Sequence, residues 1–183
     1  MIYGNSSGDG LAITQMNDLI KQLSSYNLFN YLFPGTVFCV GLNKLGGFDL
    51  IVENLFAAFF FYYFIGLTIS RVSSLIVEPI LKKNGFIKMG SYADFIKAEK
   101  KDSKIEVLSE VSNVYRTLIS LPICAGAYWT GIFVADTLSL PSSLRASAIM
   151  LFLAILFAFS YRKQNSYVVK RISANLDETS NGP

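Results

Sequence analysis

The sequence predicts an all-α protein with four transmembrane helices, an N-terminal amphipathic helix and a cytoplasmic helical extension. Three observations favour this fold class. Only 16% of the 183 residues are charged, against about 25% in average globular proteins, and the mean hydropathy is +0.42. Lysine and arginine cluster outside the most apolar segments. Four windows contain no charged side chain, namely 22–43, 54–70, 117–135 and 146–161.

Each window approaches the length of roughly 17–25 apolar residues that a membrane-spanning helix needs. A soluble domain would have to cover the whole circumference of four such helices, which a chain of 183 residues can rarely do. The pattern therefore indicates a polytopic membrane protein.

The chain divides into five segments. Residues 1–25 hold the amphipathic helix, because apolar residues recur at helical spacing (Leu11, Met16, Leu19, Ile20 and Leu23). This helix is expected at the membrane surface or on the bundle; a gate or an oligomer contact is the alternative. Residues 26–70 hold the first two spans, the second from about Leu50 to Ser70. Pro34-Gly35 in the first span predicts a kink, or a half-helix facing a pore.

Residues 71–116 form a basic cytoplasmic loop that is mostly helical. Ser91 and Asp94 have capping-box spacing, and Asn84-Gly85 predicts a turn. A helix is expected to run from this loop into the third span. Residues 117–161 hold spans three and four, and residues 162–183 form a basic cytoplasmic end and a polar tail.

The placement of lysine and arginine predicts the orientation. Residues 71–116 hold nine of the sixteen basic residues, residues 162–171 hold four, and residues 136–143 hold none. Because basic loops stay in the cytoplasm, we expect a multi-pass protein of the inner membrane with both termini cytoplasmic.

Signs of enzyme chemistry are lacking in the sequence. It contains no histidine, no Gly-x-Ser-x-Gly, no Cys-x-x-Cys and no phosphate-binding glycine loop. We therefore predict no catalytic, cofactor-binding or metal-binding residues and no cofactor.

A stripe of small residues follows the third span at 4-3-4-3-4 spacing. Such stripes let helices pack closely in lipid, and in an oligomer they can also line a narrow aqueous path. Both interpretations stay open for the stripe, which comprises Asn113, Thr117, Ser120, Cys124, Ala127 and Gly131.

Charged residues gather where the second and third spans are expected to leave the membrane. Arg71 and Glu78 are seven residues apart, which places them on one helical face, and Glu110 and Arg116 lie at the same level of the next helix. Either arginine could pair with either glutamate. These four residues are predicted to form a gate or, alternatively, to be membrane-edge charges in the lipid headgroups.

The basic loop is a candidate binding surface. Its lysines suit either anionic lipid or a phosphate-rich ligand such as a nucleotide or oligonucleotide. They are Lys82, Lys83, Lys88, Lys97, Lys100, Lys101 and Lys104.

Two stretches, "YLFPG" at 31–35 and "GLTISRVSSLIVEPILKK" at 66–83, resemble the Hailong-type membrane effectors of bacterial anti-phage defence. The resemblance covers roughly residues 26–171. It implies a homo-oligomeric ion channel that is kept closed by a nucleic-acid oligomer, which a partner nucleotidyltransferase makes.

We therefore expect an ion-conducting pore of four or more subunits, gated from the cytoplasmic face. The first alternative is a non-conducting scaffold whose basic loop docks a soluble partner. The second is a small oligomeric transporter, although no charge lies at mid-depth of a predicted span for coupled proton transport.

The orientation yields a first prediction. A reporter fused to the C-terminus should be active only when it is a cytoplasmic type, because thirteen of the sixteen basic residues lie in segments assigned to that side. Paired fusions to a cytoplasmic and a periplasmic reporter measure this. Periplasmic activity would contradict the assignment.

Overall fold

The computed structural model describes residues 28–46 and 48–180, and no strand occurs in this part of the chain. The helix predicted within residues 1–25 lies outside the described residues. The elements, in chain order, are η1 (Leu28–Leu32), α2 (Phe33–Gly46), α3 (Leu55–Val72), η2 (Ser73–Val77), α4 (Glu78–Lys83), α5 (Tyr92–Lys101), α6 (Lys104–Thr137) and α7 (Ser142–Ser180), where η marks a π-helical turn.

Among residues 28–46 and 48–180, three helices are long and apolar enough to cross a membrane. The first is the continuous helix Leu55–Lys83, formed by α3, η2 and α4; the others are α6 and the Ser142–Leu176 part of α7. The predicted transmembrane character is thereby confirmed. α6 begins well before its apolar window and runs straight into it, also as predicted.

The first of the four predicted spans is not confirmed and stays a prediction. It corresponds to the 5 residues of η1 and the 14 residues of α2. At about 1.5 Å per residue α2 alone reaches only about 21 Å, short of the hydrocarbon thickness of about 30 Å. Together, η1 and α2 come close to that length.

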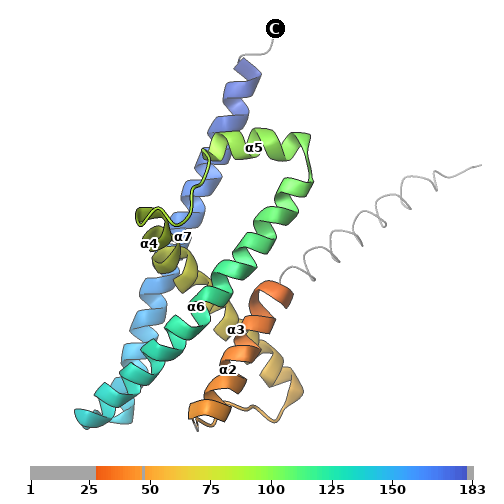
Figure 1. Cartoon of the computed structure of the whole chain (residues 1–183). Coiled ribbons are helices and arrows are strands. Elements are labelled where there is room, and N and C mark those ends of the chain that lie inside the picture. Colours follow the sequence, from red (N-terminus) through yellow and green to blue (C-terminus); the bar gives the residue numbers. More distant parts are fainter. Residues whose placement is uncertain (1–27, 47, 181–183) are drawn as a thin grey trace, which may run out of the picture.

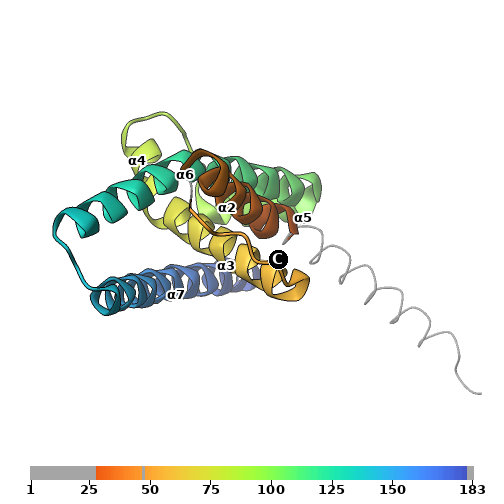
Figure 2. The same ribbon diagram turned by 90° about the horizontal axis from the view of Figure 1, so that it is seen from below.

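The helices run up and down around α3, which lies between α2 and α6 on one side and α7 on the other (Figure 2). The connections 48–54 and 138–141 lie at one end of the molecule (Figure 1). At the opposite end lie α4, α5, the first turns of α6 and the last turns of α7; we call this the basic end. α5 crosses there between α6 and α7 (Figure 1).

Two glycines let the backbone of α3 touch that of η1 and α2. A Cβ atom placed on Gly66 would lie 1.7 Å from the carbonyl oxygen of Tyr31, and one on Gly35 would lie 1.8 Å from that of Tyr62. No side chain fits at either position. The small-residue crossing is the kind that holds helices together in lipid, where hydrophobic burial gives little drive. In this structure Pro34-Gly35 therefore takes part in a helix contact.

Local hydrogen bonds set the helix ends. α3 begins at Leu55, later than the predicted Leu50, because the Asn54 side chain accepts a hydrogen bond from the Ala57 N–H at 3.0 Å and caps the helix there. The predicted Ser91 cap is confirmed, since its hydroxyl accepts from the Asp94 N–H at 3.1 Å. The predicted turn follows α4, where Gly85 has a φ of +70°.

The turn between α6 and α7 is closed by Arg145. Its Nη1 lies 2.6 Å from Asp136 Oδ1, and its Nε donates to the carbonyl of Leu140 at 2.8 Å. A cation at the C-terminus of α6 also complements the helix dipole. Arg145, near the start of α7, thus closes this turn through contacts within the chain.

The glycine crossing yields the second prediction. Gly66→Ala should destabilise the protein by about 1–3 kcal/mol, because the new methyl group would collide with the Tyr31 carbonyl and force two backbones apart. Gly126→Ala is the matched control, since a Cβ there meets nothing within 4 Å. Thermal unfolding in detergent measures both variants. Equal stability of the two would contradict the close crossing.

Candidate functional site

A buried carboxylate surrounded by cations lies at the basic end. The Glu78 side chain is only 4% exposed. Lys82 Nζ lies 2.6 Å from its Oε1, Arg116 Nη1 donates to its Oε2, and Lys163 Nζ lies 3.3 Å from the same Oε2. We call Glu78 and these three cations the Glu78 cluster. It joins α4, α6 and α7 through charge-assisted hydrogen bonds, which are the strong ones.

The sequence brings these groups together in a simple way. Lys82 follows Glu78 by one helical turn on the same helix. Arg116 directly precedes the charge-free window of α6, and Lys163 follows that of α7 by two residues. All of these groups therefore lie near the level at which their helices leave the apolar region.

A backbone irregularity recruits Lys163. In the π-helical turn η2 the N–H of Glu78 bonds to the carbonyl of Ser73, five residues back. By the same spacing the carbonyl of Ser74 would need the N–H of residue 79, but residue 79 is proline and has none. Lys163 Nζ donates to this carbonyl at 2.6 Å and to the Ser74 hydroxyl at 2.8 Å.

The carbonyl of Arg116 fixes α6 against η2. It accepts a hydrogen bond from the Ser73 hydroxyl at 2.8 Å and another from the Ser120 hydroxyl at 3.0 Å. Thr117 and Ser120 are 0% exposed at this contact. These hydrogen bonds fix the backbone of Arg116 against η2. They therefore hold its side chain within reach of the Glu78 carboxylate that it binds.

The predicted small-residue stripe divides into two parts. Towards the basic end, Thr117 and Ser120 pack within the chain, and Asn113 and Cys124 are half-buried. Further along α6, Ala127 and Gly131 are exposed. The stripe is thus an internal packing surface over its first half only, and its other half is open to lipid or to another chain.

The four predicted gate residues do not form one unit. Arg116 pairs with Glu78, whereas Arg71 Nη2 donates to the Tyr31 hydroxyl of η1 at 3.1 Å. The π-helical turn between Arg71 and Glu78 changes the helical register by about one residue, or about 100°, so their seven-residue spacing no longer places them on one face. Glu110 is half-buried and has no ion pair among residues 28–46 and 48–180.

The predicted lysine surface is exposed, including Lys82, which also binds Glu78 in the Glu78 cluster. Lys97, Lys100 and Lys101 project from α5, whose buried Ile96 anchors the helix. α5 packs on α7 through Tyr92 and Tyr167, whose ring centroids are 5.4 Å apart. Lys83, Lys88 and Lys104 are exposed in the flanking segments.

Sequence reasoning missed Lys163, Ser73, Ser74 and Tyr31. A signal for the first three was present in "SSLIVEP", because a proline five residues after Ser74 leaves a carbonyl open if the helix takes a π-helical turn. Nothing in the sequence pointed to Tyr31, whose contact with Arg71 spans 40 positions in the chain.

Within the described ranges no group of three or more His, Cys, Asp or Glu side chains could hold a metal ion. No protein-family model, curated protein or solved structure matches the chain. The site therefore has to be interpreted from its own geometry, which resembles an ion-pair clasp between helices.

The cluster yields the third prediction. Glu78→Gln should lower the free energy of unfolding by about 3 kcal/mol, at the lower end of the range for breaking a buried pair because the three cations keep some contact with solvent. Denaturation in detergent micelles measures this change.

Glu106→Gln makes the same chemical change on α6 and provides the control, because Glu106 is exposed. A Glu78→Gln protein as stable as the Glu106→Gln protein would show that the cluster does not hold the helices together.

Proposed function

We propose that the protein is a membrane effector that forms a homo-oligomeric ion-conducting pore, gated at a cytoplasmic basic end by the Glu78 cluster. The observation that carries the proposal is the cluster itself. A 4%-exposed carboxylate ties three membrane-crossing helices together at one level, the level where these helices leave the apolar region. Buried ion pairs contribute little net stability but make sensitive switches, because losing one partner leaves an uncompensated charge.

Exposed apolar surface supports an oligomer. Only 6% of the apolar window of α6, and the same share of that of α7, is buried within the chain. Lipid can cover such helices, but the exposed Ala127 and Gly131 would also allow close approach of another chain. Three or four spans are too few to enclose an aqueous path alone, so conduction requires several copies, and we expect four or more.

The biological role rests on the resemblance to Hailong-type effectors alone. By that resemblance the pore would be the toxic arm of an anti-phage system in the inner membrane, controlled by a nucleotide or oligonucleotide from a partner enzyme. The exposed lysines of α5 offer a cytoplasmic surface for such a ligand.

A second candidate function is a non-conducting scaffold. The lysines of α5 favour it, because they point away from the bundle on a helix that packs between α6 and α7 and could dock a soluble acidic partner. The two functions differ in whether the assembled protein passes ions.

Ion flux from vesicles gives the fourth prediction. The purified full chain should form a particle of four or more copies. Lys163→Gln should raise the basal leak of ions about tenfold, because it removes a charge-assisted contact to Glu78 and two hydrogen bonds to Ser74 from the closed state.

Lys170→Gln is the matched control, since Lys170 lies seven residues further along α7 and is exposed. A fluorescent ion-efflux assay and light scattering of the detergent-solubilised particle provide the two readouts. A monomer without flux would overturn the pore, and a stable ring without flux in any variant would favour the scaffold.

A further inference from the structure

A small cavity lies between the α3–η2 segment and α7. Its volume is about 30 Å³, enough to hold at least one water molecule. Where the chain is described, the lining is polar apart from Leu75 and holds no carboxylate. The polar lining residues are Arg71, Ser74, Ser160, Lys163, Gln164 and Tyr167.

Arg71 at this cavity has more donors than acceptors. A guanidinium carries five N–H groups and cannot lose its charge. The Tyr31 hydroxyl, at 3.1 Å from Nη2, is its hydrogen-bond acceptor in the structure, and its Nε is buried without one. Arg71 forms no ion pair within the described ranges 28–46 and 48–180. A buried donor without an acceptor is costly, so this guanidinium is suited to an added acceptor.

The surroundings are strongly positive. The Glu78 cluster has three cations for its one carboxylate, and Arg71 adds a fourth positive charge nearby on the same helix. Lys163 belongs to the cluster and also lines the cavity. Partly buried positive charge in such excess attracts an anion.

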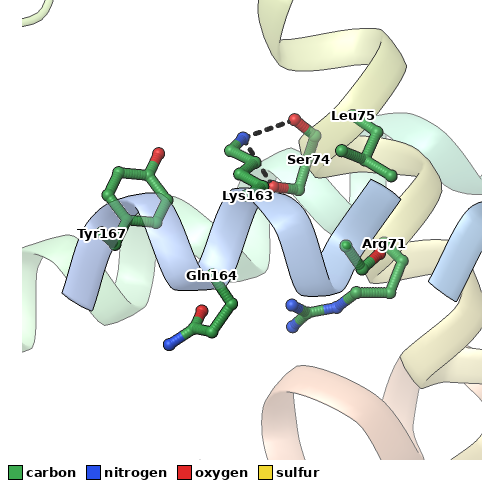
Figure 3. Close-up of a pocket in the computed structure, with 7 residues that line it drawn as sticks. Arg71, Ser74, Leu75, Lys163, Gln164 and Tyr167 are labelled. Atoms are coloured by element: carbon green, nitrogen blue, oxygen red, sulfur yellow. Dashed lines mark hydrogen bonds between the residues drawn. The ribbon is translucent and has the colours of Figure 1, made fainter. Parts of the chain in front are cut away.

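The cavity lies at the level where two charge-free windows end. Arg71 directly follows the charge-free window 54–70, and Ser160 and Gln164 lie on either side of the end of window 146–161. Figure 3 shows the Arg71 and Gln164 side chains pointing to the same side of α7, while Lys163 turns towards Ser74. Two donors from different helices therefore lie on the same side of α7 at the edge of the apolar region.

We propose that this cavity and the donors beside it bind one phosphate group at the membrane surface. At about 30 Å³ the cavity has room for phosphate oxygens but is too small for a sugar or a base, so the remainder of the ligand stays outside. An anionic phospholipid headgroup and free phosphate share this chemistry, and the level of the site makes the headgroup the expected source. The site rests on this geometry and not on ion conduction.

Binding of defined lipids to the full chain tests the site. Native mass spectrometry of the detergent-solubilised protein, titrated with dioctanoyl-phosphatidylglycerol, should show one retained lipid per chain. Arg71→Gln should weaken this binding about tenfold, because it removes a charge-assisted contact. Gln164→Leu leaves every charge in place and removes one exposed donor, so it should fold normally and weaken binding several-fold.

Arg162→Gln is the matched control. Arg162 is exposed on α7 beside Lys163 and does not line the cavity, so its loss changes the net charge equally and should leave the binding unchanged. If Arg71→Gln does not fold, the lipid binding of Gln164→Leu tests the site.

Inorganic phosphate separates the two sources. If it displaces the lipid at equal concentration, the site takes free phosphate; if it does not, the headgroup is the ligand. Binding by Arg71→Gln and Gln164→Leu that equals the parent's would overturn the proposal and leave the cavity to water.

Discussion

A carboxylate buried away from water, such as that of Glu78, needs positively charged partners close by. This requirement determines how three helices pack against one another. Lys82, on the same helix, binds one carboxylate oxygen of Glu78, and the Lys82 side chain remains 39% exposed. The second carboxylate oxygen therefore needs partners from other helices. Arg116 and Lys163 supply that oxygen from α6 and α7. Because both side chains must reach the same atom, α6 and α7 have to pass beside α4 at one fixed height.

Backbone chemistry supports this arrangement from within the helix that carries Glu78. The π-helical turn at Ser73–Val77 and the missing N–H of Pro79 open a carbonyl that Lys163 fills, so one ammonium serves both the carboxylate and the main chain. At the far side of α3, the Gly35–Gly66 contact leaves no room for side chains between the backbones. On one side, α3 is therefore held by backbone contact with α2. On the other side, the ion pairs of Glu78 hold the same continuous helix to α6 and α7.

The sequence predicted much of the fold because the strongest signals were one-dimensional. Charge-free windows located three of the spans, and the Ser91 cap and the Asn84-Gly85 turn were visible from residue type alone. The site was harder to predict. The seven-residue spacing of Arg71 and Glu78 suggested that the two side chains lie on one helical face. A single π-helical turn between them points the two side chains in different directions. Hydrophobic periodicity does not predict such a turn. The first predicted span is marginal for a related reason, since π-helical η1 and Pro34 interrupt it.

α6 and α7 are linked at both ends. Residues 138–141 and Arg145 join them at one end, and at the other α5 leads into α6 while its Tyr92 and Glu99 contact Tyr167 and Arg171 of α7. In mechanical terms this is a closed frame. Sliding of one helix along the other would strain both links together, and rotation of either helix about its own axis would draw Arg116 or Lys163 away from Glu78. We therefore expect α6 and α7 to move as one rigid unit.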